Sequence, residues 1–384
     1  MKKIKNLLGL IIGATVLLSA CSDVKSTEES IRLKDAFKDK FLIGTALNEN
    51  QYTGKDSLAV AIIRKHFNAI VAENCMKSEV LQPEEGIFDF TQADQFVAFG
   101  EANRLFMTGH CLIWHSQAPA WFFVDKKGND VSREVLIERM RTHIFTVMSR
   151  YKGIIKGWDV VNEAIEDDGS WRKSKFYTLL GEDFVRLAFQ FAHEADPAAE
   201  LYYNDYSMSN EGRRNEVIRM VKSLQAQNIP IHGIGMQGHC GMNYPSLEAF
   251  EKSIIAFSEL GVKVMITEFD MGVLPMPNAN AGADVSLVFD YQQEMNPYSN
   301  RLPEIVENAW TERFNAFFQL FLKHSDKISR VSFWGVTDAD SWKNDWPIRG
   351  RTDYPLLFDR NYQPKNIVQL ICHGALDAPS PENR

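Results

Sequence analysis

The stretch GWDVVNE, residues 157–163, is a short apolar run that ends in two polar side chains, Asn162 and Glu163. A run of this length predicts a buried strand. Seven comparable runs occur along the chain, and segments of helical pattern separate them. The eight predicted strands are residues 41–47, 69–72, 105–113, 157–162, 201–204, 233–237, 263–267 and 330–334.

The segments between these strands predict helices, several of which begin after a capping residue such as Thr91, Ser132 or Ser246. They are residues 56–67, 92–102, 133–151, 183–194, 211–227, 247–260 and 305–324, with a last helix beginning near Pro364. Eight strands that are each followed by a helix imply a parallel sheet with helical crossovers.

Such a sheet can be open and doubly wound, or it can close into a barrel. No GxGxxG or P-loop motif follows any strand, so the nucleotide-binding version of the open sheet lacks its signature. Polar and aromatic residues instead follow nearly every strand, as they do at the mouth of a barrel whose loops build the active site. The sequence therefore predicts a single-domain (β/α)8 TIM barrel, an α/β fold.

The N-terminus has the pattern of an export signal. Lys2, Lys3 and Lys5 precede an apolar run over residues 7–18, which is short for a membrane-spanning helix. Residues 18–21 read LSAC, which predicts a signal peptide over residues 1–20 and lipidation of Cys21. An ordinary signal peptide with a chance cysteine is the alternative.

These features predict a cell-envelope lipoprotein, with the outer membrane as the expected location and its periplasmic or cell-surface face left open. A lipid chain on one residue anchors a protein without spanning the bilayer. We expect a polar tether over residues 21–36, the barrel over residues 37–376 and a tail over residues 377–384.

Composition narrows the classes of partner. The net charge is −8 at pH 7 with no basic cluster, which argues against nucleic acid, and membrane contact is expected only through the lipid anchor. Cys75, Cys111, Cys240 and Cys372 form no CxxC pair, so neither a disulfide framework nor a zinc site is predicted. A bridge between Cys75 and Cys111 stays open, because both follow neighbouring strands.

Two carboxylates close apolar strands. Glu163 follows the fourth predicted strand, and Glu268 follows the seventh in the sequence ITEFD, residues 266–270. Either one alone could cap a helix or pair with a cation, but the two strands reach the same barrel mouth. Glycoside hydrolysis needs two such groups, one to protonate the leaving oxygen and one to attack the anomeric carbon.

Neighbouring polar residues suit this chemistry. Asn162 could hold a sugar hydroxyl, and the sixth strand supplies Gln237 and His239. We expect His239 to hydrogen-bond Glu268 and keep it ionised, and Asp270 to orient the histidine in turn. His110 and His115 lack the close His-x-His spacing and later ligands of a metal-dependent barrel hydrolase, so no catalytic metal is predicted.

Aromatic residues gather in the predicted loops at the barrel mouth, where they could stack on sugar rings. They are Trp114, Trp121, Trp334, Trp342 and Trp346. Lys77 and Arg349 offer charged donors to hydroxyls, although either could be an ordinary surface charge. The longest irregular stretch, residues 272–303, is predicted to be either a substrate-side loop or a disordered insertion.

From about residue 37 to residue 373 the chain resembles the endo-β-1,4-xylanases of glycoside hydrolase family 10. The matching stretches are FNAIVAEN (67–74), MK (76–77), residues 109–117 and 158–165, YYNDY (202–206), GMQGH (235–239), TEFD (267–270) and FWGVTD (333–338), followed by Trp342. The resemblance implies a retaining enzyme that hydrolyses xylan and xylo-oligosaccharides without a cofactor, with Glu163 as acid/base and Glu268 as nucleophile.

The resemblance also implies where the sugars bind. Around the sugar at the cleavage point it places Asn162, Gln237, His239, His110, Lys77, Trp334 and Trp342. It places Glu73, Asn74, Trp114 and Gln117 on the non-reducing side, and Asn204 and Tyr206 near the leaving group. Cys75 and Ser78 depart from the commoner pattern, which predicts different packing behind the non-reducing side.

The sequence alone leaves two alternative functions open. A related barrel glycosidase could act on β-1,4-glucan or mixed-linkage glucan, whose sugars carry a CH₂OH group that xylose lacks; in a xylanase Trp342 and Gln117 should crowd that position. A sugar-binding lipoprotein that had lost catalysis would show decay of the reacting pair, but Glu163 and Glu268 are both present.

Overall fold

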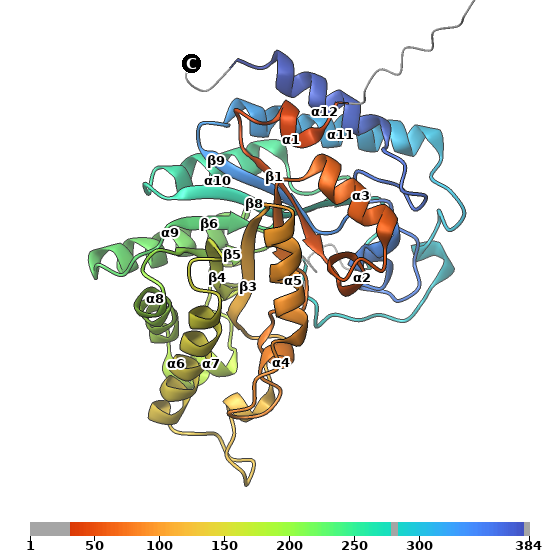
Figure 1. Cartoon of the computed structure of the whole chain (residues 1–384). Helices are drawn as coiled ribbons and strands as arrows, with labels where there is room; N and C mark the ends of the chain where they lie inside the picture. Colours follow the sequence, from red (N-terminus) through yellow and green to blue (C-terminus); the bar gives the residue numbers. More distant parts are fainter. Residues whose placement is uncertain (1–30, 278–282, 380–384) are drawn as a thin grey trace, which may run out of the picture. The chain divides into compact units, whose positions relative to one another are not determined.

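Eight parallel strands close into a barrel in the computed structural model, which describes residues 31–277 and 283–379 (Figure 1). They are β1 (Leu42–Leu47), β2 (Ala69–Ala72), β3 (Phe106–Trp114), β4 (Gly157–Asn162), β5 (Glu200–Asp205), β6 (Gly233–Met236), β8 (Lys263–Gly272) and β9 (Ile328–Phe333). Pairing of β1 with β9 and of β6 with β8 closes the ring. The predicted (β/α)8 barrel is confirmed.

One strand was not predicted from the sequence. Strand β7, His239–Gly241, is three residues long and pairs in parallel with the far end of β8, so that His239 lies opposite Asp270. This pairing extends β8 to Gly272, beyond the predicted end at residue 267, and holds two candidate site residues side by side.

Helices cover the outside of the barrel. The longer ones are α3 (Ser57–His66), α5 (Thr91–Ala102), α6 (Arg133–Arg150), α8 (Asp183–Ala195), α9 (Glu211–Ala226), α10 (Leu247–Ser258), α11 (Glu304–Lys323) and α12 (Asn366–Asp377). Short helices are α1 (Leu33–Ala36), α2 (Glu49–Tyr52), α4 (Ser78–Leu81) and α7 (Lys175–Leu180), and the 3₁₀ turns are η1 (Ala120–Phe122), η2 (Gln293–Met295), η3 (Asp338–Asp340) and η4 (Trp342–Asn344).

Two of the three predicted helix caps are confirmed. The side chains of Ser132 and Ser246 accept hydrogen bonds from backbone N–H groups in the first turns of α6 and α10. The third is wrong: Thr91 is the first residue of α5, and the Asp89 carboxylate accepts its N–H.

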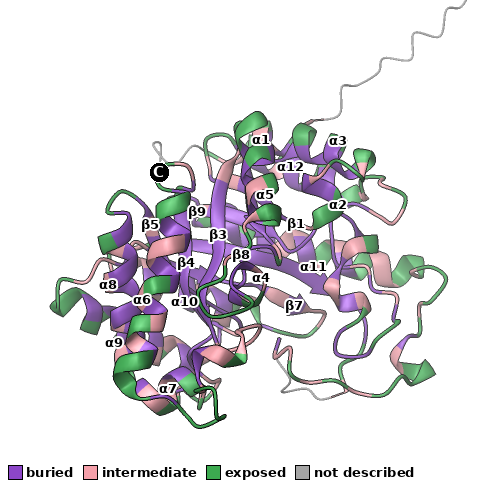
Figure 2. Cartoon of the chain, turned by 60° about the horizontal axis from the view of Figure 1, so that its bottom comes forward, coloured by how far each residue is buried: buried purple, intermediate pink, exposed green. Residues whose placement is uncertain are grey.

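Alternation along β8 sets the two faces of that strand. The ring of Phe269 packs against α11, with ring centroids 5.0 Å from Phe314 and 5.4 Å from Phe321. Because successive side chains of a strand point to opposite faces, Glu268 and Asp270 face the barrel interior. The barrel strands are buried nearly throughout (Figure 2).

The folded unit begins earlier than the predicted tether allows. Residues 33–36 form α1, which packs against α12, and Leu33 is fully buried (Figure 1). The apolar contact of Leu33 outweighs the polar character of the preceding segment, so the barrel unit starts at Ile31 rather than at Phe37. The predicted signal peptide and Cys21 lie outside the described residues.

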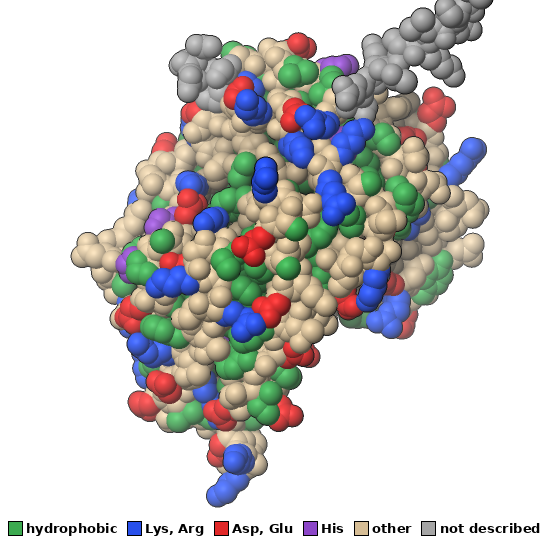
Figure 3. Space-filling view, viewed as in Figure 1, with side chains coloured by type: hydrophobic (Ala, Val, Ile, Leu, Met, Phe, Trp, Pro, Cys, Tyr) green, Lys and Arg blue, Asp and Glu red, His purple; other side chains and the backbone are tan. Residues whose placement is uncertain are grey.

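The surface and the cysteines agree with the composition. Acidic and basic side chains are mixed over the face shown in Figure 3. Cys75, Cys111, Cys240 and Cys372 are free and buried, so Cys75 and Cys111 are not bridged. Within residues 31–277 and 283–379, none of the helices combines the length and the apolar character that a membrane crossing requires.

Candidate active site

Glu163 follows β4 directly and takes a left-handed backbone conformation, with φ of 59°. Its N–H donates to the carbonyl of Asn204. A non-glycine residue in this region costs about 1 kcal/mol or more, and such strain clusters at functional sites. In this site it accompanies a carboxylate that is turned into the barrel mouth and is only 5% exposed.

Three donors hold the Glu163 carboxylate. Oε1 accepts from Asn162 Nδ2 at 3.1 Å and from Gln237 Nε2 at 2.9 Å, and Oε2 accepts from the indole N–H of Trp114 at 2.8 Å. Burial raises the pKa of Glu163 and the charge of Glu268 raises it further, against the lowering by these hydrogen bonds. Glu163 is therefore suited to carry a proton at the pH where an ordinary glutamate has lost it.

Glu268 lies on β8 in a different environment. Its Oε1 accepts from Asn204 Nδ2 at 2.8 Å, and its Oε2 lies 3.2 Å from His239 Nε2. Burial alone would raise the pKa of Glu268, but the His239 hydrogen bond, the nearby His110 and the Asn204 amide together lower it. Glu268 is thus held as a carboxylate, as a nucleophile must be.

His239 is clamped between two acids, as predicted. Its Nδ1 lies 2.9 Å from Asp270 Oδ2, which also accepts the indole N–H of Trp342 at 2.9 Å. Burial disfavours the charged imidazole, but Asp270 and Glu268 prevail and raise the pKa of His239 to about 9. At neutral pH His239 is an imidazolium that donates both N–H groups, one to Asp270 and one to Glu268.

The two glutamates are joined by one network of amides. The Asn162 side-chain oxygen accepts from Asn204 at 2.9 Å and from Gln237 at 3.3 Å, so the partners of Glu163 and Glu268 bond to each other. Two carboxyls whose pKa values are pushed apart within one site are the usual arrangement for an acid and a nucleophile.

The glutamates line a cavity of about 230 Å³ at the barrel mouth. Eleven other predicted site residues line it too: Glu73, Asn74, Lys77, His110, Trp114, Gln117, Asn162, Gln237, His239, Trp334 and Trp342. Ala283 and Val285, which were not predicted as site residues, complete the wall. The structure thus brings together most of the residues that the resemblance implied.

Polar groups concentrate on one side of this cavity. Lys77 Nζ donates to Asn74 Oδ1 and to Gln117 Oε1, each at 2.8 Å, and lies 4.9 Å from the ring centroid of Trp114. Burial lowers the pKa of Lys77 and raises that of Glu73. These donors and acceptors, set beside an aromatic ring, suit the hydroxyls and C–H faces of a sugar.

Asn204 and Tyr206, which were predicted to lie near the leaving group, do not line this cavity. Asn204 is fully buried, its amide donates to Asn162 and Glu268, and its oxygen accepts from Thr267 Oγ1 at 2.6 Å. Tyr206 is also buried, and its hydroxyl accepts from Arg172. Asn204 pairs with Asn162 across β5 and β4, beyond a register shift at Asp159–Val161, and this pairing directs Asn204 toward the network under the glutamates. The place of both residues near the leaving group stays a prediction.

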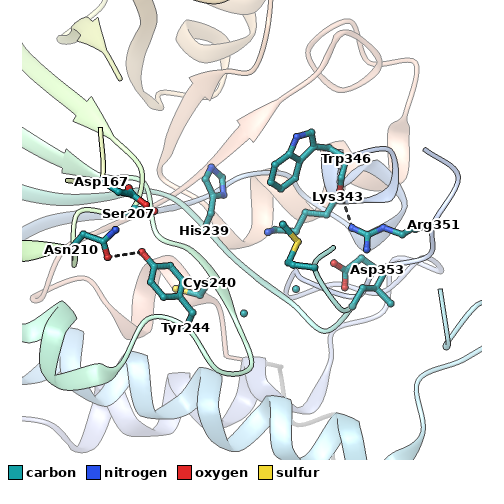
Figure 4. Close-up of a pocket in the computed structure, with 14 residues that line it drawn as sticks. Asp167, Ser207, Asn210, His239, Cys240, Tyr244, Lys343, Trp346, Arg351 and Asp353 are labelled. Carbon is teal, nitrogen blue, oxygen red and sulfur yellow. Dashed lines mark hydrogen bonds between the residues drawn. The ribbon is translucent and has the colours of Figure 1, made fainter. Parts of the chain in front are cut away.

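The predicted aromatic platforms divide into two groups. Trp334 and Trp342 line the cavity, whereas Trp346 stacks on Trp342 at 4.6 Å and lines a neighbouring hollow that also reaches His239 (Figure 4). Trp121 stacks on Phe122 and donates to the Gln82 carbonyl, outside both hollows. Arg349 is exposed and lines neither.

Two supporting residues were not predicted from the sequence. Asp159 Oδ2 lies 2.9 Å from His110 Nδ1 and fixes that ring, and its place within GWDVVNE was the available signal. Arg172 donates to the Glu163 carbonyl at 3.1 Å from an irregular segment after β4, where no pattern points to it. Among the described residues no three His, Cys, Asp or Glu side chains are grouped as metal ligands.

Comparison with known proteins gives one family. The model of glycosyl hydrolase family 10 matches residues 32–373. Endo-1,4-beta-xylanase A of Xylanibacter ruminicola is 51% identical over 339 residues, which cover 88% of this chain and 92% of that protein. An endo-1,4-beta-xylanase of Geobacillus stearothermophilus is 40% identical over 351 residues, covering 90% of this chain and 97% of the relative.

Solved structures agree with these relatives. A GH10 endoxylanase from a sugarcane soil metagenome superposes with a TM-score of 0.85 at 46% identity, covering 88% of this chain and 99% of the other. Xylanase XynB from Paenibacillus barcinonensis gives a TM-score of 0.81 at 37% identity, covering 90% and 99%.

Proposed function

This chain belongs to glycosyl hydrolase family 10 and is a retaining endo-1,4-β-xylanase, in which we propose that Glu163 is the general acid/base and Glu268 the nucleophile. The observation that carries the assignment of roles is the opposite direction of the two pKa shifts, raised at Glu163 and lowered at Glu268. Two carboxylates in these states are what a double displacement requires.

In the first step Glu268 attacks the anomeric carbon of the sugar at the cleavage point. A carbon–oxygen bond to Glu268 forms as the interglycosidic bond breaks, and Glu163 gives its proton to the departing sugar oxygen. His239 faces the Oε2 atom and Asn204 the Oε1 atom of Glu268, so the attacking carboxylate is oriented before substrate arrives.

In the second step Glu163, now ionised, takes a proton from water. The water oxygen bonds to the anomeric carbon, the bond to Glu268 breaks, and the sugar is released with its original configuration. Trp114 and Gln237 donate to Glu163 and stabilise its charged state during this half of the cycle.

Substitution of the nucleophile tests this assignment. Glu268→Ala should abolish xylan turnover and leave xylo-oligosaccharide binding, measured by calorimetry, largely intact. NMR of the first product should show the β anomer. Near-normal activity of the variant, or an α anomer, would contradict the roles of the two glutamates.

Substrate class has its own test, since a β-1,4-glucan or mixed-linkage substrate is the competing possibility. Release of reducing sugar from xylan, cellulose and mixed-linkage glucan should strongly favour xylan. The presence of Trp342 and Gln117 in the cavity wall supports this expectation, because both should crowd the CH₂OH group of a glucosyl unit.

We also propose that the protein is anchored in the cell envelope, at the outer membrane, through lipid on Cys21 after removal of residues 1–20. The charged start, the apolar run and the LSAC sequence support this proposal. Mass spectrometry of the mature N-terminus should find a lipid-modified cysteine, and Cys21→Ser should release the enzyme from membranes. Protease treatment of intact cells would distinguish the two membrane faces.

A further inference from the structure

The peptide bond that joins Glu163 to Ala164 is held at both ends by side chains from other parts of the chain. The Glu163 carbonyl accepts from Arg172 Nε at 3.1 Å, and the Ala164 N–H donates to the hydroxyl of Tyr203 at 3.0 Å. Because the carbonyl and the N–H belong to one planar group, the two bonds fix its orientation. We call these two bonds the peptide clamp.

The peptide clamp acts on a residue with a disfavoured backbone. Glu163 has φ of 59°, and a side-chain-bearing residue keeps such a conformation only where its surroundings fix it. The N–H of Glu163 donates to the Asn204 carbonyl at 2.9 Å, which holds the peptide before Glu163. The clamp holds the peptide after it. The direction in which the Glu163 side chain leaves the backbone is therefore set from both sides.

The Tyr203 hydroxyl is itself held in one orientation. It donates its proton to Asp205 Oδ2 at 2.5 Å, so its oxygen is left to accept from Ala164. Asp205 Oδ1 lies 3.3 Å from Arg213 Nη1, and Tyr203, Asp205 and Arg213 are all fully buried. Burial raises the pKa of Tyr203 and the charge of Asp205 raises it further, so the phenol keeps its proton.

The clamp residues do not meet the substrate directly. Neither Tyr203 nor Arg172 lines the cavity that contains Glu163 and Glu268. An effect of either residue on the reaction must therefore pass through a group that does line it. Tyr203 could act through the backbone of Glu163, or through its neighbour Asn204, which donates to the nucleophile. The two routes affect different substrates, which makes them separable.

We propose that Tyr203 and Arg172 are positioning residues, which hold the Glu163–Ala164 peptide so that the carboxyl of Glu163 meets the leaving oxygen. This inference rests on the proposed function. Without the Tyr203 hydroxyl, the buried Ala164 N–H loses its partner, and the peptide turns toward another acceptor. The turn moves the backbone of Glu163 while Trp114 and Gln237 still bond to its carboxyl, so proton transfer to the leaving oxygen becomes slower.

The test compares two substrates that differ in their need for a proton. The departing sugar of linear xylohexaose must be protonated, whereas the phenolate of a dinitrophenyl β-xylobioside departs without a proton. For both, kcat/KM is measured for the wild type, Tyr203→Phe and Tyr202→Phe. Tyr202→Phe is the matched control: it removes a buried hydroxyl from the same strand, one that donates to Glu200 Oε2 at 2.7 Å.

We expect Tyr203→Phe to lower kcat/KM on xylohexaose about fivefold or more, through kcat, and to leave the dinitrophenyl value within about twofold of the wild type. Both values should stay within about twofold in Tyr202→Phe. A loss of equal size on the two substrates would place the effect at the nucleophile or in the fold and overturn the proposal. An unchanged value on xylohexaose would also overturn it.

If Tyr203→Phe fails to fold, Arg172→Lys tests the other end of the clamp. This variant keeps the positive charge beside Glu166 and Asp284 but has no Nε to donate to the Glu163 carbonyl. The same selective loss on xylohexaose is expected, and an equal loss on both substrates or no loss would contradict the clamp. Absence of xylan hydrolysis by the wild type would refute the proposed function itself and is a distinguishable outcome.

Discussion

Asp270→Asn should lower the pH at which His239 loses its proton. The Asp270 carboxylate is fully buried, lies 2.9 Å from His239 Nδ1, and is a principal cause of the raised pKa of about 9 at His239. An asparagine keeps an oxygen for the Trp342 indole and for the imidazole N–H, but it removes the charge.

The magnitude follows from the energy of a hydrogen bond to a charged group, about 1.5–3 kcal/mol. Since about 1.4 kcal/mol corresponds to one pKa unit, the pKa of His239 should fall by about one to two units, to about 7–8. At the lower pH where Glu268 ionises, His239 still carries its proton in both enzymes, because the pKa of Glu268 is lowered. The change is therefore expected at higher pH, where His239 of the variant loses its charge before that of the wild type.

The assay is an NMR titration of the His239 imidazole in the free enzyme over about pH 5 to 10. We expect the midpoint in Asp270→Asn to lie about one to two units below that of the wild type. Asp196→Asn is the control: the buried Asp196 carboxylate bonds to the backbone N–H groups of Gly153 and Ala198, so this variant should leave the His239 midpoint unchanged. An unshifted midpoint in Asp270→Asn would refute the role of Asp270 in keeping His239 charged.

Three further perturbations test other parts of the structure. Glu163→Ala should slow the hydrolysis of xylan by about 10²–10⁴-fold but slow the hydrolysis of an aryl xyloside with a good leaving group far less. Xylan is measured in a stopped assay and the aryl xyloside in a continuous one. Equal losses on the two substrates would speak against general acid catalysis by Glu163. Asn204→Ala should lower kcat about 10–100-fold with little change in KM, because Asn204 contacts Glu268 and does not line the cavity. The lost hydrogen bond to the charged carboxylate is worth about 1.5–3 kcal/mol. A raised KM with a normal kcat would instead indicate that Asn204 contacts the substrate. Phe269→Ala should reduce the free energy of unfolding in urea by about 3–5 kcal/mol, because it leaves a cavity among the rings that pack against α11. The control, truncation of the exposed Val288 to alanine, should change this free energy by less than about 0.5 kcal/mol. Similar losses in the two variants would mean that the ring cluster contributes little to stability.

Local patterns predicted the barrel well. The strands at residues 69–72 and 157–162 have the predicted bounds, because each is a short apolar run with clear flanks. Strand β7 was missed because His239–Gly241 has no apolar alternation and forms only through its pairing with β8. The start of the unit was misplaced because the burial of Leu33 depends on α12, at the far end of the sequence.

In the active site too, some contacts were predictable from local sequence and others depend on how distant segments pair. The pairing of His239 with Glu268 and Asp270 was predictable, since strand ends and residue types indicated both the place and the chemistry. The bond from Asn204 to Glu268 was not, because it depends on the register of β5 against β4. Arg172 and Asp284 form an ion pair, but both lie in irregular segments, and no local pattern predicts that they meet.

The alternation along β8 has a consequence for how this protein can change over time. Glu268, Phe269 and Asp270 are consecutive in β8. Glu268 and Asp270 face the catalytic site, and Phe269 between them packs against α11. Gain or loss of one residue upstream in the strand would invert this order and place a phenyl ring at the reacting carbon while two acids enter the apolar layer. A protein with such an insertion or deletion would lose its fold and its activity together, so changes of length in this region are tolerated only after Gly272. The irregular connection to α11 begins there, so the sequence after Gly272 is where new substrate preferences can arise without risk to the nucleophile.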